Sequence, residues 1–354
     1  MRILAAVVLA VALVTGCAGS AAAPSPSLAD IGAGLQGPAG LTATTEASGL
    51  ANVSAFAFDA DGRLWAATAS FADDGTDAVY LVPRAGTAPV KVITDVHTPL
   101  GLVWDDGTLF VSNGDGIEAY RDLDADTDGF ATHAAILTLP AGIGQVNGLA
   151  LSPDGRLFLG VSAPCDACEP ETAAAAAVVS VLPDGTDLRV EAGHIRAPVG
   201  LAFYPGTDDL FVTMNQRDDL ADATPGDWLA VVHAGQDWGF PDCYGQDAAA
   251  CRGVPTPVAV LDKHAAVSGV AIVTGGLGGS IGTSAIVAEW ATGLVLRVPL
   301  ATDGTTDTGT AEPFLAGLSK PVPVAVAPDG ALFVGDWATG TVYRIRSSAV
   351  ASLS

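Results

Sequence analysis

Short apolar segments, joined by turns rich in Asp, Gly and Pro, recur along most of the chain. The pattern is clearest in Ala55–Trp65, Gly148–Phe158 and Pro323–Phe333, where an apolar run, an Asp-Gly pair and a second apolar run follow one another. Asp-Gly is favoured in tight hairpin turns because both residues tolerate positive φ. Each segment therefore predicts a β-hairpin, and its strands, which are apolar nearly throughout, are expected to be buried on both faces.

Six copies of this hairpin pattern divide the chain into repeats. They start at Ala55, Gly101, Gly148, Gly200, Gly269 and Pro323, and the successive starts are 46, 47, 52, 69 and 54 residues apart. Further strands are predicted at Val79–Val82, Val178–Val181, Ser284–Ala288 and Val295–Val298. A period of about fifty residues with two or more strands per unit is typical of a β-propeller blade. We therefore predict an all-β, six-bladed β-propeller that forms a single domain over residues 35–346.

The ends of the repeat array and its longest gap complete this prediction. Gly40–Thr44 is expected to pair with the last blade, which closes the ring and leaves no long exposed strand edge. The long gap between the fourth and fifth copies holds additional loop residues. Loops of this kind usually build the mouth of a propeller channel, where ligands bind.

The N-terminal segment has the pattern of an export signal. Arg2 precedes the apolar run Ile3–Val14, which is too short to cross a membrane and has the length of a signal-peptide core. Two small residues then stand directly before Cys17, as in the lipobox of bacterial lipoproteins. We expect a signal peptide over residues 1–16, a lipid anchor on Cys17, a flexible tether over 17–34 and a tail over 347–354. The protein is then an exported lipoprotein of the bacterial cell envelope; a general secretory signal with an incidental Cys is the alternative.

Charge excludes two classes of protein. The 39 acidic residues outnumber the 15 basic ones, and the formal net charge is −24. A nucleic-acid-binding protein needs a dense Lys and Arg surface, so that class is excluded. Charged residues make up only 15% of the chain and hydrophobic residues 49%, which excludes a disordered acidic protein.

The cysteines agree with export. Besides Cys17, the chain contains Cys165, Cys168, Cys243 and Cys251. An even number in an exported chain favours disulfides, so we predict two local pairs, 165–168 and 243–251. A zinc site formed by all four is the alternative.

Two segments of the chain carry more specific motifs. Residues 195–204 read Ile-Arg-Ala-Pro-Val-Gly-Leu-Ala-Phe-Tyr, and residues 238–245 read Trp-Gly-Phe-Pro-Asp-Cys-Tyr-Gly. They resemble the glucose/sorbosone dehydrogenase family, especially its sorbosone-dehydrogenase-like branch, whose typical members carry Arg-Asn-Pro-Val-Gly-Leu-Ala-Phe and Tyr-Gly-Trp-Pro-x-Cys-Tyr-Gly at these places. The Cys-Asp-Ala-Cys segment after the third hairpin, His264–Gly269 and Lys320–Gly330 are similar to further family motifs.

This resemblance implies a six-bladed propeller that binds pyrroloquinoline quinone (PQQ) and Ca²⁺ at the channel mouth and oxidises a sugar, polyol or aldehyde. In such an enzyme a His removes the hydroxyl proton while hydride passes to the quinone, and an electron acceptor, which the sequence does not identify, reoxidises the cofactor. The residues that it implies for holding PQQ are Arg196, Asn215, Arg217 and Lys320. We expect the protein to act as a monomer.

The family's catalytic His normally stands just before the third hairpin. Here that stretch contains Gln145 and no His. Gln145 hydrogen-bonds but takes no proton at neutral pH, so the catalytic candidates are Gln145 by position and His264 as a displaced base. The segment Glu289–Thr292 in the fifth repeat also lacks an expected basic residue. A second hypothesis is therefore a non-catalytic propeller that binds a sugar, a metal or a protein partner.

Two acidic segments are candidate Ca²⁺ sites. Asp124, Asp126 and Asp128 have the spacing of the first half of an EF-hand loop, although Ala135 stands where the bidentate Glu would be. Asp218 and Asp222 belong to an acidic loop in the long gap after the fourth hairpin. Both segments have an alternative interpretation as solvated turns of an acidic protein.

Overall fold

The computed structural model describes residues 27–72, 75–245, 249–301 and 309–348. The signal peptide, Cys17, the first part of the tether and most of the predicted tail lie outside these ranges. Within them, no helix is long and apolar enough to cross a membrane.

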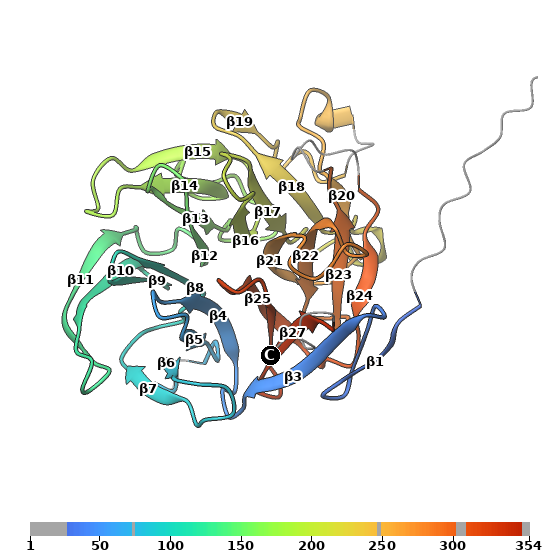
Figure 1. Ribbon diagram of the computed structural model, residues 1–354. Coiled ribbons are helices and arrows are strands. Elements are labelled where there is room, and N and C mark those ends of the chain that lie inside the picture. The colour runs from blue at the N-terminus through green and yellow to red at the C-terminus, as the bar shows by residue number, and fades with distance from the viewer. Residues whose placement is uncertain (1–26, 73–74, 246–248, 302–308, 349–354) are drawn as a thin grey trace, which may run out of the picture.

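Six antiparallel four-stranded sheets stand around a common axis, as Figure 1 shows, and confirm the predicted propeller. The third sheet gains a fifth, parallel strand. The blades, written from inner to outer strand, are β4 (Val53–Phe58), β5 (Leu64–Thr68), β6 (Ala78–Val82) and β7 (Val90–Ile93); β8 (Gly101–Asp105), β9 (Thr108–Asn113), β10 (Gly116–Leu123) and β11 (Phe130–Thr138); β12 (Val146–Leu151), β13 (Leu157–Val161), β14 (Ala177–Val181), β15 (Arg189–Gly193) and the parallel β19 (Gln236–Asp237); β16 (Pro198–Phe203), β17 (Leu210–Met214), β18 (Trp228–Val232) and β20 (Ala259–Val260); β21 (Val267–Thr274), β22 (Thr283–Glu289), β23 (Leu294–Pro299) and β24 (Glu312–Leu315); and β25 (Pro321–Val326), β26 (Leu332–Asp336), β27 (Thr341–Ser347) and β3 (Leu41–Ala47).

The apolar residues of the repeats form six separate cores, and each core fills the space between two neighbouring blades. Fully buried Trp65, for example, lies in the core between blades 1 and 2, and Phe211 lies in the core between blades 4 and 5. A middle strand contributes side chains to the cores on both of its faces, which explains why the strands are apolar nearly throughout. The ring is thus held by hydrophobic contacts between sheets that share no hydrogen-bonded edge.

The ring closes as predicted, because β3 at the N-terminus pairs with β27 at the C-terminus, from Leu41 opposite Ser347 to Ala47 opposite Val342. The tether prediction is too long, however. A hairpin of β1 (Ala29–Gly32) and β2 (Leu35–Gly37) precedes β3, and Gln36 donates a backbone hydrogen bond to Ala316 beyond the last strand of blade 5. Ile31 and Leu35 are buried in the core between blades 5 and 6, which anchors the hairpin to the ring.

The Asp-Gly pairs form turns of two kinds. In blade 2, Asp106 and Gly107 both have positive φ, which is the geometry of a two-residue type I′ turn. In blades 1, 3 and 6 only the Gly has positive φ, and its N–H bonds the carbonyl three residues earlier, so Asp and Gly close a four-residue turn. The hairpins are therefore where the sequence predicts them, with a longer turn in three of the blades.

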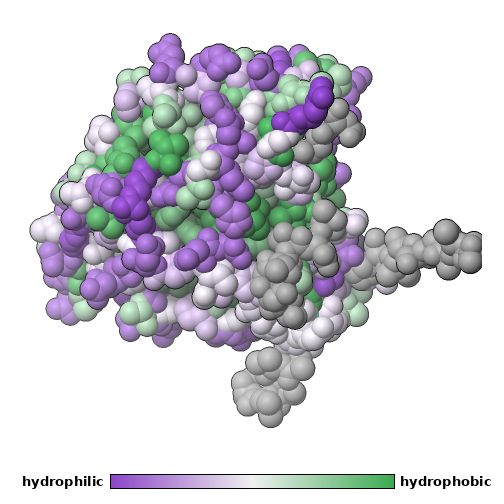
Figure 2. Space-filling view, turned by 90° about the horizontal axis from the view of Figure 1, so that it is seen from above, coloured by the Kyte–Doolittle hydropathy of each residue, from purple (hydrophilic) through white to green (hydrophobic). Residues whose placement is uncertain are grey.

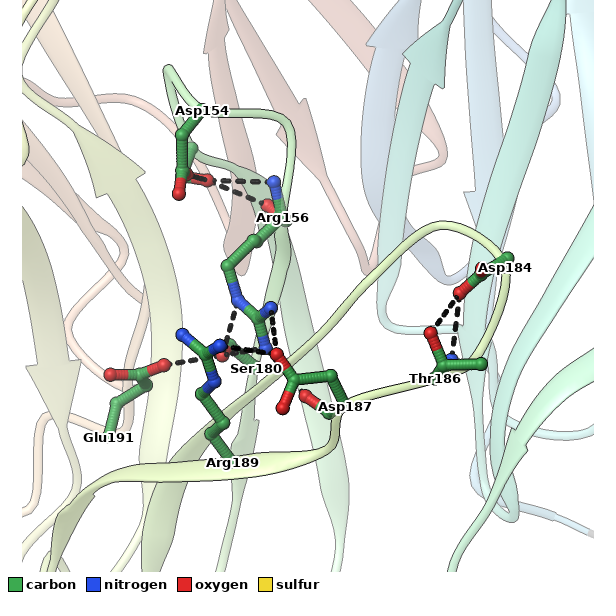
Figure 3. A network of polar contacts seen from close by, with 9 residues as sticks. Asp154, Arg156, Ser180, Asp184, Thr186, Asp187, Arg189 and Glu191 are labelled. Atoms are coloured by element: carbon green, nitrogen blue, oxygen red, sulfur yellow. Dashed lines mark hydrogen bonds and ion pairs between the residues drawn. The ribbon is translucent and has the colours of Figure 1, made fainter.

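Charged residues near these turns bind their own blade. Buried Arg156, which follows the Asp-Gly turn of blade 3, donates to the Ser180 hydroxyl at 3.1 Å and to the Asp187 carboxylate at 3.0 Å. Arg189 and Glu191 extend this network along the outer strand, as Figure 3 shows. Elsewhere the side of the propeller is a mosaic of hydrophilic and smaller hydrophobic areas (Figure 2). Some of the acidic residues thus lie in polar networks that bind neighbouring strands of one blade.

The long stretch of sequence between the fourth and fifth hairpins contains β18 and β20 of blade 4, β19 of blade 3, the short 3₁₀ helices η1 (Ala221–Ala223) and η2 (Ala249–Cys251), and the connecting loops. Disulfides join Cys165 to Cys168 and Cys243 to Cys251, which confirms both predicted pairs and removes the zinc alternative. The second disulfide ties the loop after β19 to η2.

Candidate functional site

A cavity of about 670 Å³ lies on the axis of the ring. Residues of all six inner strands line it, together with residues that follow the second strand of blades 1, 3, 4, 5 and 6. The inner strands approach one another closely at its mouth: a Cβ on Gly148 would come within 2.5 Å of the Val199 carbonyl oxygen, and one on Gly200 within 2.4 Å of the Ser268 carbonyl oxygen. Glycine is therefore required at these positions of the repeat.

Polar side chains gather where the inner strands begin and the second strands end, and we call this end the rim. Its polar members among the described residues are Ser54, Ser70, Gln145, Asn147, Ser162, Asn215 and Ser268. Asn147 is 3% exposed and donates to the Ser162 hydroxyl and the Pro198 carbonyl, both at 2.8 Å. The Oδ1 of Asn215 is buried without a hydrogen-bond partner. Since an unpaired buried acceptor is costly, a donor from a bound molecule would stabilise it.

Aromatic rings complete the rim. Trp290 and Trp337 meet edge to face with their ring centroids 6.1 Å apart. The Nε1 of Trp337 donates to the Ala69 carbonyl at 2.9 Å, which fixes its orientation. Phe71 of blade 1, which has a φ of 59° and is 61% exposed, also lines the cavity. Flat apolar faces next to hydroxyl and amide groups are the surface that sugar rings need, because a sugar presents C–H groups on its faces and hydroxyls at its edge.

No ionisable side chain lines the cavity among the described residues. Lys320 comes near, but its Nζ lies 3.8 Å from the centre of the Trp290 ring, where it makes a cation–π contact. The wall therefore offers hydrogen bonds and apolar contacts without a fixed charge or a group that accepts a proton near neutral pH.

Buried carboxylates position the rim from behind. The Asp227 carboxylate accepts the backbone N–H of Gln216, next to Asn215, at 2.8 Å, and the N–H of Val267, next to Ser268, at 3.1 Å. In blade 1, Asp77 likewise accepts the N–H of Ser70 at 2.7 Å and binds the loop that leads to the next inner strand. Through these hydrogen bonds, each carboxylate links two segments of the rim. One segment follows the second strand of the blade, and the other leads into the inner strand of the next blade.

Two of the carboxyls near the rim have altered acidity. Burial raises the pKa of Asp227 to about 6, against the lowering effect of its two backbone hydrogen bonds. Burial also raises the pKa of Glu289, which directly precedes Trp290, to about 7. Glu289 is fully buried and accepts a hydrogen bond from the Thr292 hydroxyl at 2.8 Å. Neither carboxyl lines the cavity.

The predicted catalytic residues separate in space. Gln145 lines the cavity, and its Nε2 donates to the Val146 carbonyl at 3.0 Å. His264 does not line the cavity. Its Nδ1 lies 2.7 Å from the Asp218 carboxylate and its Nε2 lies 3.0 Å from the Ala221 carbonyl, contacts that raise its pKa. The structure therefore places Gln145 and not His264 beside a molecule in the cavity.

The residues predicted to hold a cofactor also separate. Asn215 lines the cavity, whereas Arg196, Arg217 and Lys320 do not. Arg196 pairs with Asp166 in the loop of the first disulfide and donates to the Asn215 carbonyl at 3.1 Å. Arg217 binds both carboxylate oxygens of Asp219 at 2.7 Å and lies over the Tyr244 ring. Both guanidinium groups are thus committed to carboxylates of the chain itself.

The predicted calcium ligands are not assembled. In the described part of the chain, no group of three or more His, Cys, Asp or Glu side chains is placed to hold a metal ion. Asp124 accepts the N–H groups of Asp126 and Thr127, and Asp128 pairs with Arg63 at 3.1 Å. Asp218 binds His264, and the backbone carbonyl of Asp222 accepts a hydrogen bond from the Lys263 Nζ at 3.3 Å. In the structure both segments are therefore acidic turns, which was the alternative interpretation of their sequence.

The sequence did not single out Asn147, Ser162, Trp290 and Trp337. Three of these four follow the second strand of a blade directly, because β13 ends at Val161, β22 at Glu289 and β26 at Asp336. The residue directly after the second strand lines the cavity in blades 3, 4, 5 and 6, so an alignment of the ends of the second strands is the signal that marks these residues in the sequence.

No protein-family model matches the sequence, and no curated protein matches it. Solved structures do match. The PQQ-bound aldose sugar dehydrogenase of Streptomyces coelicolor is 18% identical, with a TM-score of 0.67, over 88% of this chain and 99% of that one. The soluble aldose sugar dehydrogenase of Escherichia coli in its apo form is 16% identical, with a TM-score of 0.68, over 87% and 99%. The calcium structure of a family AA12 carbohydrate-active enzyme from Trichoderma reesei is 17% identical, with a TM-score of 0.71, over 94% and 100%.

The chain shares its fold with sugar dehydrogenases. At these identities the likeness shows the fold, which agrees with the propeller predicted from the repeats. Membership of the sorbosone-type branch stays a prediction. The described lining residues provide no cation for the carboxylates of PQQ, so the cavity wall by itself does not fit this cofactor; Lys320 lies beside the wall, over the ring of Trp290. For Ca²⁺ the described wall provides amide oxygens, such as the unpaired Oδ1 of Asn215, and no carboxylate.

Proposed function

We propose that this protein binds a small neutral sugar or polyol at the rim of its central cavity. The observation that carries the proposal is the composition of the rim: amides, hydroxyls and indole rings, with no ionisable side chain among the described lining residues. Such a surface pairs hydroxyl groups and covers C–H faces without attracting ions. The names of the solved relatives, aldose sugar dehydrogenases and a carbohydrate-active enzyme, support a carbohydrate as the ligand.

Isothermal titration calorimetry tests the proposal, with a panel of aldoses, polyols and methyl glycosides added to the purified protein without cofactor. We expect saturable binding of at least one class. Trp290→Ala should weaken that binding about tenfold, since an aromatic contact contributes about 0.5–1.5 kcal/mol beyond its buried area. Trp104→Phe is the matched control, because Trp104 packs on Trp65 in the core between blades 1 and 2 and does not line the cavity. Absence of binding across the panel contradicts the proposal.

The fold supports a second candidate, oxidation of a sugar with PQQ, because solved relatives include a PQQ-bound aldose sugar dehydrogenase. This function needs a proton acceptor beside the substrate hydroxyl, and Gln145 stands at the family's His position. Titration with PQQ and Ca²⁺, followed by dye reduction with the same sugars, tests it. Binding without turnover, together with turnover in Gln145→His, would identify a chain that has lost its base; turnover by the unchanged chain would identify an active dehydrogenase.

We propose that the protein is held by a lipid anchor at the outer face of a bacterial membrane. The support is the sequence alone, the apolar run before Cys17 and the small residues directly preceding it. Labelling of growing cells with a fatty acid should mark the protein, and Cys17→Ser should remove the label and release the chain in soluble form. An unlabelled wild-type protein would favour a general secretory signal.

A further inference from the structure

The cavity continues beyond the rim along the inner strands, and we call this deeper part the channel. On β25 the lining includes every residue from Val322 to Val326, the last residue of the strand, and on β21 it runs from Ser268 to Ile272. Four residue steps at about 3.3 Å each give the channel a length of about 13 Å. The cavity is therefore deeper than a single sugar ring requires.

The chemistry of the wall changes along this length. Beyond Ser268, the lining residues of β21 are Gly, Val, Ala and Ile; on β25 they are Val, Pro and Ala; and on β16 they are Val, Gly, Leu and Ala. Every polar side chain in the described lining belongs to the rim. The inner strands stand at the edge of their sheets, so unpaired backbone groups also face the axis, but the channel side chains are apolar throughout. A ligand that fills the whole cavity thus needs a polar end at the rim and an apolar end in the channel.

We infer that the ligand is a sugar or polyol with an apolar substituent, such as an alkyl or aryl glycoside, whose sugar lies at the rim and whose substituent enters the channel. This inference rests on the proposed function, since the rim must hold the sugar. Full burial of a methylene tightens binding about fourfold. Because the unpaired strand edges retain water, a gain of about two- to fourfold per methylene is expected here.

The channel has small side chains that a mutation can enlarge. Ala325 on β25 and Ala202 on β16 are half-buried, line the channel and lie far from the rim in their strands. Ala325→Phe or Ala202→Phe places a ring in the path of the substituent and leaves the rim unchanged. Ala131→Phe is the matched control, because Ala131 is exposed on the outer strand β11. Thermal unfolding shows whether each variant is folded, and two separate blocking sites keep the test valid when one fails.

Calorimetry with a homologous series of β-glucosides, or of the sugar found in the panel above, from methyl to hexyl, tests the inference. Glycosides with an ethylene-glycol chain of equal length are the polar controls, and n-hexanol is the control without a sugar. We expect affinity to rise with alkyl length in the wild type and in Ala131→Phe, to stay level with the ethylene-glycol chains, and to stop rising in the blocking variants.

Four other outcomes overturn the inference in distinguishable ways. Equal affinity for methyl and hexyl glycosides would show that the sugar binds at the rim and that the channel does not bind the substituent. A rise that persists in both blocking variants places the substituent outside the channel. Binding of hexanol without binding of any methyl glycoside overturns the proposed function as well, and so does the absence of binding by every compound.

Discussion

Asp227 gives the sharpest prediction about how the rim is held. Its carboxyl is 2% exposed and joins Gln216 to Val267 behind the cavity wall. Burial raises its pKa to about 6, and the charge of Asp218 acts in the same direction. In the unfolded chain the pKa of the same carboxyl is close to the ordinary aspartate value of 3.8. The folded protein therefore holds a proton that the unfolded chain loses between these two values.

The direction in which stability changes with pH follows from proton linkage. A folded pKa above the unfolded one adds stability that is fully present below the unfolded pKa and is lost as pH rises through the folded pKa. The difference of about 2 pKa units corresponds to about 3 kcal/mol of unfolding free energy, lost between about pH 4 and pH 6. Asp227→Asn removes this contribution because the amide does not titrate. Glu289→Gln should remove a similar fall at higher pH, between the ordinary glutamate pKa of 4.5 and about 7.

Urea unfolding followed by tryptophan fluorescence, from pH 4 to pH 8, measures both effects. The quantity to compare is the difference in unfolding free energy between wild type and variant at each pH, since this difference cancels the carboxyls that the two chains share. We expect it to change most between pH 4 and 6 for Asp227→Asn and between about pH 4.5 and 7 for Glu289→Gln. A difference that is constant across the whole range would refute the buried, protonated state of either carboxyl.

Three further predictions concern the scaffold and the rim. Replacing Cys243 and Cys251 together by Ser should lower the unfolding free energy by about 2.5 kcal/mol, as expected for opening a short loop, and reductant should then have a smaller effect on the thermal midpoint. Arg156→Met should lower it by about 1–3 kcal/mol, because the buried Ser180 hydroxyl and the Asp187 carbonyl lose a charged donor (Figure 3), whereas an unchanged urea midpoint would show that the network is dispensable. Asn147→Ala should cost about 1–3 kcal/mol in unfolding free energy, because the Pro198 carbonyl loses its donor, and should weaken sugar binding by calorimetry; normal stability and affinity together would contradict its place in the rim.

The blades were predictable because their signal is local. Each hairpin combines two apolar runs and a turn within about ten residues of sequence, and six copies at a spacing of 46 to 69 residues leave few architectures open. The closing strand followed from the same logic, since β3 must cover the edge of the last blade. The hairpin of β1 and β2 was not predicted because Ile31 and Leu35 are its only large buried apolar side chains, too few to stand out beside a tether rich in Ala, Gly and Ser.

The site was harder to predict because it is made by ring closure. Trp290 and Trp337 lie 47 residues apart in the sequence and meet only when neighbouring blades pack. Family motifs pointed instead to charged residues such as Arg196 and His264, and the fold does place them near the mouth. Each is paired with a carboxylate from a neighbouring loop, Asp166 and Asp218 respectively, and neither lines the cavity. Which carboxylate pairs with Arg196 or His264 depends on how the loops are placed in the folded structure. The spacing of residues along the sequence does not reveal it.

The central claim is that the cavity is a neutral sugar site. Its most direct test is a calorimetric titration of the purified, cofactor-free protein with PQQ in the presence of Ca²⁺, beside a titration with the neutral sugar panel. The absence of cations from the described cavity wall predicts saturable heat with a sugar and no PQQ binding at micromolar concentrations. Micromolar PQQ binding, without any sugar binding in the absence of PQQ, would contradict the claim and identify the cavity as a cofactor site.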